Sequence, residues 1–168
     1  MADTCTKTYD VGRSRLVSYA FGCGNDDPTT AGSLVYSPFG STTTKNDGVV
    51  VGDVDATTDD SNGFDEAIQT SISQEYTISG LRRPDEAQIA AQEALKDYIV
   101  TERLAGRDAT GWLRLTDPIS NKQLYRYVLF TGYSESDGTN DIISIEFTAK
   151  LQATRSTTNP PIQSEVIA

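Results

Sequence analysis

The chain has 168 residues, the size of one ordinary domain and enough to bury a hydrophobic core. Its residues are 37% hydrophobic and 23% charged, which excludes intrinsic disorder, and no apolar run approaches the roughly 18 residues that a membrane helix requires. The formal net charge is −10, from 14 Lys and Arg against 24 Asp and Glu, and no stretch concentrates the basic residues. Because affinity for nucleic acid rests on cations that neutralise phosphates, this balance argues against ordinary DNA or RNA binding.

The N-terminal residues lack the basic start and apolar run of a signal peptide, which predicts folding in the cytoplasm of the producing cell. The two cysteines, Cys5 and Cys23, are too few for a disulfide scaffold and form no CxxC motif. Free thiols are expected in a reducing compartment, and the sequence leaves a bridge between the two open.

The first part of the chain predicts one strand and one long loop. Residues 10–21 end in a mixed apolar stretch that indicates a strand, whereas residues 22–48 are dense in Gly, Asn, Asp, Pro, Thr and Ser. We predict that 22–48 is a long projecting loop that becomes ordered on a neighbouring molecule, with a mobile surface loop as the alternative. The candidate anchors for that contact are the apolar residues of the segment, Leu34, Val35, Tyr36 and Phe39.

The middle of the chain predicts two strands and a helix. Residues 49–58 have an extended pattern, an Asn-Gly turn follows, and residues 71–78 alternate between apolar and polar, the period of a half-buried strand. The one helix that we predict spans residues 84–97, because Pro84 fits the first helical position and the run after it is rich in helix formers.

The last part of the chain predicts further strands and an extended end. The expected strands are residues 98–104, 112–116, 123–134 and 143–151. Residues 154–168, which contain two adjacent prolines, predict an extended C-terminal tail. The predicted fold is mainly β, an antiparallel β-barrel or sandwich with one flanking α-helix, in a single domain that spans residues 1–168.

Catalytic motifs are missing from the sequence. There is no histidine, which removes the commonest general base, the usual serine and cysteine triads and the usual zinc sites. Neither a GxGxxG motif nor a P-loop occurs. We therefore expect a protein that is not an enzyme and that holds no cofactor and no metal.

One acidic cluster surrounds the Asn-Gly turn, and its members are Asp53, Asp55, Asp59, Asp60, Asp65 and Glu66. An EF-hand register through Gly63 places Thr58 and Gln69 where acidic calcium ligands belong, so this interpretation fails. No two carboxylates stand out as a glycosidase pair. Two hypotheses remain for this cluster: a solvated acidic turn or, if the segment lines a channel, a surface that repels polyanions.

Residues 54–81 carry a resemblance to a known family. A Val-Asp-Ala-Thr-Thr strand enters an acidic Ser-Asn-Gly turn, and the next strand closes on Ile-Ser-Gly-Leu before the predicted helix. This order resembles the central region of the major tail tube proteins of long-tailed bacteriophages, and residues 127–151 are similar to their final hairpin. The likeness extends over residues 49–152 as an ordered pattern.

The resemblance implies a structural subunit that is not an enzyme. Tail tube proteins assemble as six-membered rings that stack into a hollow tube, through which DNA is ejected without specific binding. The implied partners are further copies of the chain, the tape measure, tail terminator and baseplate or tail-tip proteins, with no membrane binding. The implied location is the virion tail, after assembly in the host cytoplasm, and the acidic cluster is the candidate lumen surface.

Two other functions stay open at this stage. One is the inner tube of a contractile injection or type VI secretion system, which shares the architecture. The other, from a different class, is a carbohydrate-binding or carboxylate-dependent hydrolytic β-sandwich, which would need a concave groove with convergent carboxylates and exposed aromatic residues. We expect the candidate aromatic residues, Trp112, Tyr125, Tyr127 and Tyr133, to be core or subunit-interface residues instead.

Overall fold

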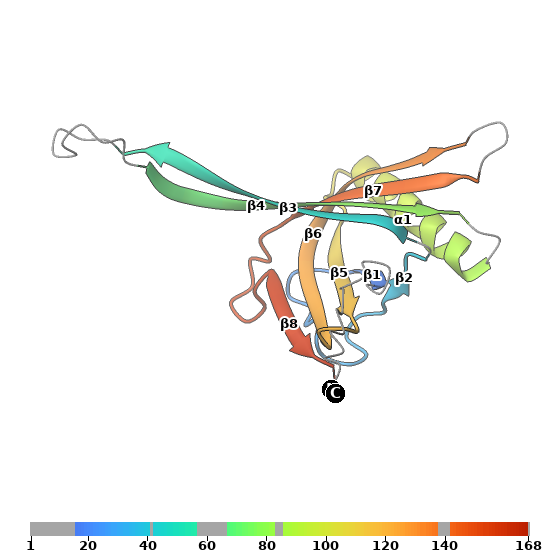
Figure 1. The fold of residues 1–168 in the computed structure, drawn as a ribbon, viewed down its shortest axis with the longest axis horizontal. Coiled ribbons are helices and arrows are strands. Elements are labelled where there is room, and N and C mark those ends of the chain that lie inside the picture. Colours follow the sequence, from blue (N-terminus) through green and yellow to red (C-terminus); the bar gives the residue numbers. More distant parts are fainter. Residues whose placement is uncertain (1–15, 41, 57–66, 83–85, 138–141, 168) are drawn as a thin grey trace, which may run out of the picture.

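A computed structural model describes residues 16–40, 42–56, 67–82, 86–137 and 142–167. The elements in chain order are β1 (Leu16–Phe21), β2 (Ser37–Pro38), β3 (Thr42–Asp55), β4 (Ala67–Leu81), α1 (Glu86–Leu104), β5 (Thr110–Asp117), β6 (Lys122–Ser136), β7 (Ser144–Leu151) and β8 (Ile162–Val166) (Figure 1). No helix in these segments is long and apolar enough to span a membrane.

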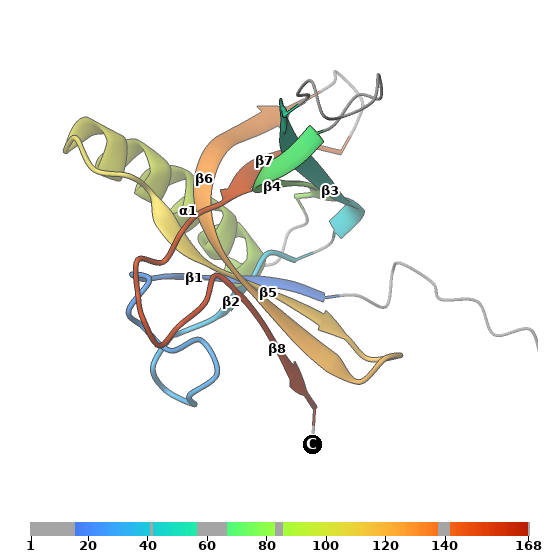
Figure 2. The same ribbon diagram turned by 90° about the vertical axis from the view of Figure 1, so that its left-hand side faces the viewer.

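All strands of the described residues belong to one antiparallel sheet that bends at β6 (Figure 2). The strand order is β2-β1-β5-β6-β7-β4-β3, and β8 pairs with β6 outside this path. The first half of β6 pairs with β5 and β8, and its second half, from Val128, pairs with β7. A register shift between Phe130 and Gly132 lies at the bend, where an extra residue increases strand curvature. As a result β7, β4 and β3 run across the top of the molecule in Figure 1, while β1 and β5 lie below them.

The hydrophobic core fills the angle between the two parts of the sheet. Tyr19 and Leu113 reach it from β1 and β5, and Ile78 and Phe147 reach it from β4 and β7, each completely buried. Phe39, which follows β2, meets Phe147 edge-on with ring centroids 4.6 Å apart. The alternation predicted for residues 143–151 is confirmed, because every second side chain of β7 faces this core.

Helix α1 packs against the core through a face that combines large and small side chains. Leu95 is completely buried, and the small Ala91 beside it lets the backbone approach closely enough for the Tyr19 hydroxyl to donate a hydrogen bond to its carbonyl oxygen. Gln92 is also buried, and its Nε2 donates to the Phe39 carbonyl oxygen at 3.2 Å. The helix thus connects β1 and the segment after β2 to one core.

The predicted helix at residues 84–97 is confirmed in place but not in length. Residues 98–104, which we predicted as a strand, continue α1 to Leu104. The β-branched residues in that stretch favour a strand only weakly, whereas Tyr98 and Ile99 pack on the core when the helix continues. Gly106 ends the helix with a φ of 72°, a conformation that a residue without Cβ adopts readily.

The prediction of one loop over residues 22–48 is wrong in its extent and in its direction. Residues 42–48 belong to β3, because they pair with the inner end of β4. Residues 22–36 lie against the body: the Trp112 indole nitrogen donates to the Cys23 carbonyl oxygen at 3.2 Å, and Asn159 donates to the Asn25 carbonyl oxygen at 2.9 Å. The element that projects is the hairpin of β3 and β4 (Figure 1).

The C-terminal segment is extended, as predicted, but part of it joins the sheet. β8 pairs antiparallel with the first residues of β6, from Lys122 opposite Val166 to Arg126 opposite Ile162. The Asn121 side-chain amide also donates to the Ile167 carbonyl oxygen at 2.6 Å. The wider prediction, a mainly antiparallel β fold with one flanking helix, is confirmed.

Candidate functional site

The outer half of the β3–β4 hairpin forms a two-stranded arm that extends beyond the body (Figure 1). We define the arm as residues 49–55 of β3 and 67–73 of β4. Gln74 is the outermost buried residue of β4. The arm exposes six large apolar side chains, Val49, Val50, Val51, Val54, Ile68 and Ile72. The prediction of a half-buried strand over residues 71–78 therefore holds only from Gln74 onward.

Strand alternation divides the arm into two faces. Val49 lies opposite the buried Gln74, and Val51 lies opposite Ile72, so these residues continue the side of the sheet that faces the core. Asp53 and Asp55 follow two and four residues further out on β3. The register shift between Gly52 and Asp53 leaves its extra residue, Thr70, on β4, so the alternation of β3 continues and both carboxylates lie on the same face. We call the face with Val49, Val51, Ile72, Asp53 and Asp55 the core-side face of the arm. It begins apolar and ends acidic.

The arm is incomplete as an isolated structure. A two-stranded ribbon is only marginally stable in water, and contiguous exposed apolar residues usually mark an interaction surface. Close packing of the ribbon itself is seen at Gly52, where a Cβ atom would lie 2.5 Å from the Ser71 hydroxyl oxygen. The shape of the arm is thus determined by packing within the hairpin, whereas its large apolar side chains stay exposed in the isolated subunit.

A second surface lies on the other side of the four-strand region of β3, β4, β7 and β6. The polar side chains that face away from the core there are Thr44, Asn46, Glu75, Thr77, Ser79, Ser134, Ser136, Ser144, Glu146, Thr148 and Lys150. We call this set the hydroxyl face. Its charged side chains bind other members of the same face. Lys150 Nζ lies 2.8 Å from Glu75 Oε1, and the Ser79 hydroxyl donates to Glu146 Oε2 at 2.9 Å.

Two of the six acidic residues selected from the sequence lie in the part of the chain that the structure describes. Asp53 and Asp55 are exposed on the core-side face of the arm, not on the hydroxyl face. Asp59, Asp60, Asp65 and Glu66 lie outside the described residues. Among the residues described, no three His, Cys, Asp or Glu side chains come together as a metal site. The candidate acidic lumen therefore stays a prediction.

The four apolar anchors predicted in residues 22–48 lie in three different environments. Phe39 is completely buried in the core of its own chain and has no surface left for a neighbour. Leu34 and Tyr36 are half-buried beside Trp112 and Tyr125. Only Val35 is free for an outside contact, with 83% of its side chain exposed.

Tyr36 holds its loop on the body through three contacts. Its hydroxyl donates to the Pro28 carbonyl oxygen at 3.3 Å, the Arg114 guanidinium lies 4.3 Å from its ring centroid, and the Tyr125 ring centroid is 6.1 Å away. Burial raises the pKa of Tyr36 above its usual value, and the nearby Tyr125 adds to the rise. Asp27 orders the same loop by accepting hydrogen bonds from Thr30 and Thr29, which lower its pKa.

Three of the four aromatic residues that we expected in the core or at a subunit interface, rather than in a sugar-binding platform, are buried. Trp112, Tyr125 and Tyr127 are 0%, 3% and 6% exposed and form a second cluster under Leu34 and Tyr36. A carbohydrate-binding platform needs exposed ring faces. The geometry of this cluster therefore does not support the sugar-binding alternative.

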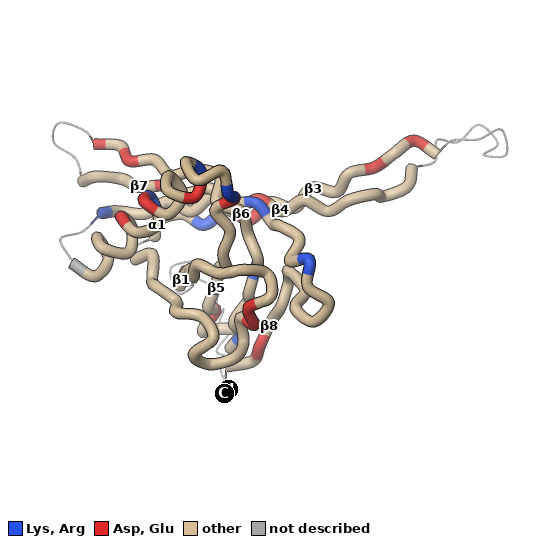
Figure 3. Tube along the Cα trace, turned by 180° about the vertical axis from the view of Figure 1, so that it is seen from behind, with Lys and Arg blue, Asp and Glu red and all other residues tan. Residues whose placement is uncertain are grey.

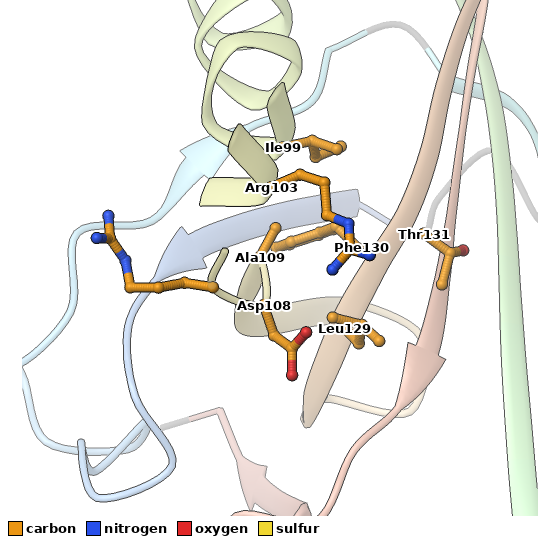
Figure 4. Close-up of a pocket in the computed structure, with 8 residues that line it drawn as sticks. Ile99, Arg103, Asp108, Ala109, Leu129, Phe130 and Thr131 are labelled. Carbon is orange, nitrogen blue, oxygen red and sulfur yellow. The ribbon is translucent and has the colours of Figure 1, made fainter. Parts of the chain in front are cut away.

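A groove that the sequence did not indicate lies between the C-terminal half of α1 and β6. It measures about 280 Å³ and is lined by Ile99, Arg103, Arg107, Asp108, Ala109, Leu129, Phe130 and Thr131. Figure 4 shows the Arg103 side chain reaching from α1 into the groove toward Phe130. Arg107 is bound to Glu102 at 2.7 Å, a bond that raises the pKa of Arg107 and lowers that of Glu102.

No family model matches the sequence, and no curated protein matches it. Solved structures do match its fold. A chain of the SPP1 tail tube is similar with a TM-score of 0.57 and 14% identity over 94% of this chain and 81% of that chain. A chain of the tail of an empty gene transfer agent particle, a structure with C6 symmetry, has a TM-score of 0.59 and 13% identity, over 95% of this chain and 100% of that chain. A chain of the anti-feeding prophage baseplate has a TM-score of 0.52 and 12% identity, over 96% of this chain and 98% of that chain.

These similarities extend over nearly the whole chain, so the chain has the tail-tube fold. The resemblance to tail tube proteins that the sequence suggested is thereby confirmed for the fold.

Proposed function

We propose that the protein is the tail tube subunit of a phage-like particle, located in the virion tail after assembly. The observation that carries the proposal is the tail-tube fold, which matches over 94% of this chain in the SPP1 comparison. The unpartnered arm supports it independently, because six exposed large apolar side chains on a two-stranded ribbon require a neighbour. Rings of six subunits, as the C6 symmetry of the gene transfer agent tail suggests, would supply such neighbours.

The hydroxyl face is our candidate for the wall of the channel. Most of its side chains are short and polar, and its one lysine is bound to Glu75. Passing DNA would therefore meet no free cation on the described part of this face, and phosphate binding depends on such cations. The predicted partners other than the chain itself, namely the tape measure, terminator and tail-tip or baseplate proteins, belong to the same proposal.

A related function has a specific observation in its favour. The match to the anti-feeding prophage baseplate, at a TM-score of 0.52, makes a subunit of a contractile injection system the second candidate. Both functions require self-assembly into a ring or tube. They differ in what the channel passes, so the nucleic acid content of particles purified from the producing cell separates them.

Electron microscopy of the purified protein over a concentration series tests the proposal. We expect hollow tubes or rings of uniform bore above a threshold concentration. A matched variant replaces residues 50–73 with Asn-Gly, so that a short turn joins Val49 to Gln74. This variant should fold, since the removed residues leave the core intact, and should stay monomeric. A wild-type protein that remains monomeric at all concentrations, also after addition of preformed tube ends, contradicts the proposal.

A further inference from the structure

The groove between α1 and β6 contains a cation that has no ion-pair partner among the described residues. Arg103 is exposed and forms no ion pair with any residue that the structure describes. Asp108 also lines the groove, but its carboxylate points away from Arg103 and no ion pair joins the two side chains (Figure 4). Most of the other basic side chains in the described residues are engaged: Arg82 with Glu93, Arg107 with Glu102 and Lys150 with Glu75.

The floor of the groove is apolar. Ala109 and Phe130 are buried beneath it, and Ile99 and Leu129 are half-buried at its sides. Val100 and Leu104 extend the apolar surface along the outside of α1, with 51% and 85% of their side chains exposed. An occupant therefore has to bring apolar side chains for the floor and an anionic group for Arg103.

The core-side face of the arm has this chemistry. Val51 and Ile72 lie side by side on it, and Asp53 follows two residues further out, exposed and without an ion pair to a described residue. Strand residues two apart are separated by about 6.5 Å, so an apolar pair and a carboxylate fit a groove of this size together. Residues 46–81 contain no Lys or Arg, and in Figure 3 the only charged residues on the outer arm are acidic.

The arm cannot fill the groove of its own chain. In Figure 1 its outer half extends away from the body, with no other element beside it. A contact between the arm of one copy and the groove of another uses two different surfaces, and such heterologous contacts produce rings or filaments.

We propose that the arm of one subunit docks in the α1–β6 groove of another, an inference that rests on the proposed function. Val51 and Ile72 cover the apolar floor, and Asp53 forms an ion pair with Arg103. The groove is thus the receiving site of the assembly contact, and the arm of a second copy is its occupant. Because the ion pair lies at an interface edge, it determines which surfaces meet more than how tightly they bind.

A charge exchange tests the contact. The variants Arg103→Asp and Asp53→Arg should each raise the concentration needed for assembly at least tenfold, and the double variant should return it to within about threefold of wild type. Lys122→Asp, which reverses an exposed cation at the start of β6, is the matched control and should assemble normally. Single variants that assemble normally overturn the proposal. The proposal is also overturned if the double variant needs a concentration for assembly that is raised by the combined effect of the two single substitutions.

Cysteine cross-linking tests the same contact without requiring tubes. In a chain with Cys5→Ser and Cys23→Ser, the pair Asp53→Cys and Arg103→Cys should form intermolecular disulfides under mild oxidation. The control pair Asp53→Cys and Lys122→Cys should not. If cross-linked oligomers form although tubes never do, the contact stands and the proposed function fails. If tubes form but only the control pair cross-links, or neither pair does, the groove is not the receiving site.

Discussion

Replacing the apolar side chains on the core-side face of the arm should abolish assembly and leave the subunit folded. The perturbation is the triple substitution Val49→Ser, Val51→Ser and Ile72→Ser. In the isolated subunit these side chains are already 60%, 41% and 66% exposed, so about half of each is solvent-accessible before assembly. The free energy of unfolding of the subunit should therefore fall by no more than about 3 kcal/mol, at most about 1 kcal/mol for each of the three strand positions.

The effect on assembly is larger because docking buries the surface that is still exposed. Complete burial of a Val or Ile side chain contributes about 1.5–3 kcal/mol, and roughly half of each side chain remains to be covered. Three side chains then contribute about 3 kcal/mol per arm, which corresponds to roughly a hundredfold change in the concentration needed for assembly.

Sedimentation of assembled material against total concentration measures that threshold, and urea unfolding of the unassembled protein measures the stability of the subunit. The matched control is Val166→Ser on β8, where a valine is 66% exposed but lies on the body. The control should keep the wild-type threshold. An unchanged threshold in the triple variant would refute the reasoning, and so would a large loss of subunit stability.

Two further predictions concern the body. Phe39→Ala should lower the free energy of unfolding by about 3–5 kcal/mol in urea titrations, because it leaves a cavity at a fully buried site. The control Val35→Ala should change the free energy of unfolding little, because that side chain is exposed. A Phe39→Ala subunit of normal stability that fails to assemble would instead support the predicted interface role of Phe39. Burial raises the pKa of Tyr19 and of Tyr76 to about 12, from 10.0 in the unfolded chain. Since the folded state then keeps protons that the unfolded state loses, stability should be complete below pH 10 and should decline as pH rises through 10 toward 12. Tyr19→Phe should flatten this decline in unfolding experiments at several pH values, and an identical pH profile for the variant would contradict the assignment.

The sequence predicted those parts of the fold in which local pattern and environment agree. On β7 the alternation of Ile145, Phe147 and Ala149 with polar residues indicated a strand with one buried face, and that face is buried. The start of α1 after Pro84 followed from helix propensity and position. The tail-tube resemblance over residues 49–152 depended on the order of such elements, and order survives changes in individual residues.

The candidate surfaces could be predicted only in part. Asp53 and Asp55 were selected as acidic residues, but the sequence did not show that they share a face with Val51. The α1–β6 groove was not predicted, because Arg103 and Phe130 are far apart in the chain and meet only when the helix lies along β6. No local pattern encodes such a meeting.

The sequence by itself determined the β-rich class, the single long helix, the acidic charge and the absence of histidine chemistry. Tertiary structure decided which apolar residues are core and which are exposed. Phe39 and Val35 stand four residues apart in one polar segment, yet the first is completely buried and the second is 83% exposed. In the same way Val51 and Ile78 have the strand pattern of a buried face, but only Ile78 lies where other strands and α1 cover the sheet. Burial depends on which elements pack over a residue, and that is a property of the whole chain.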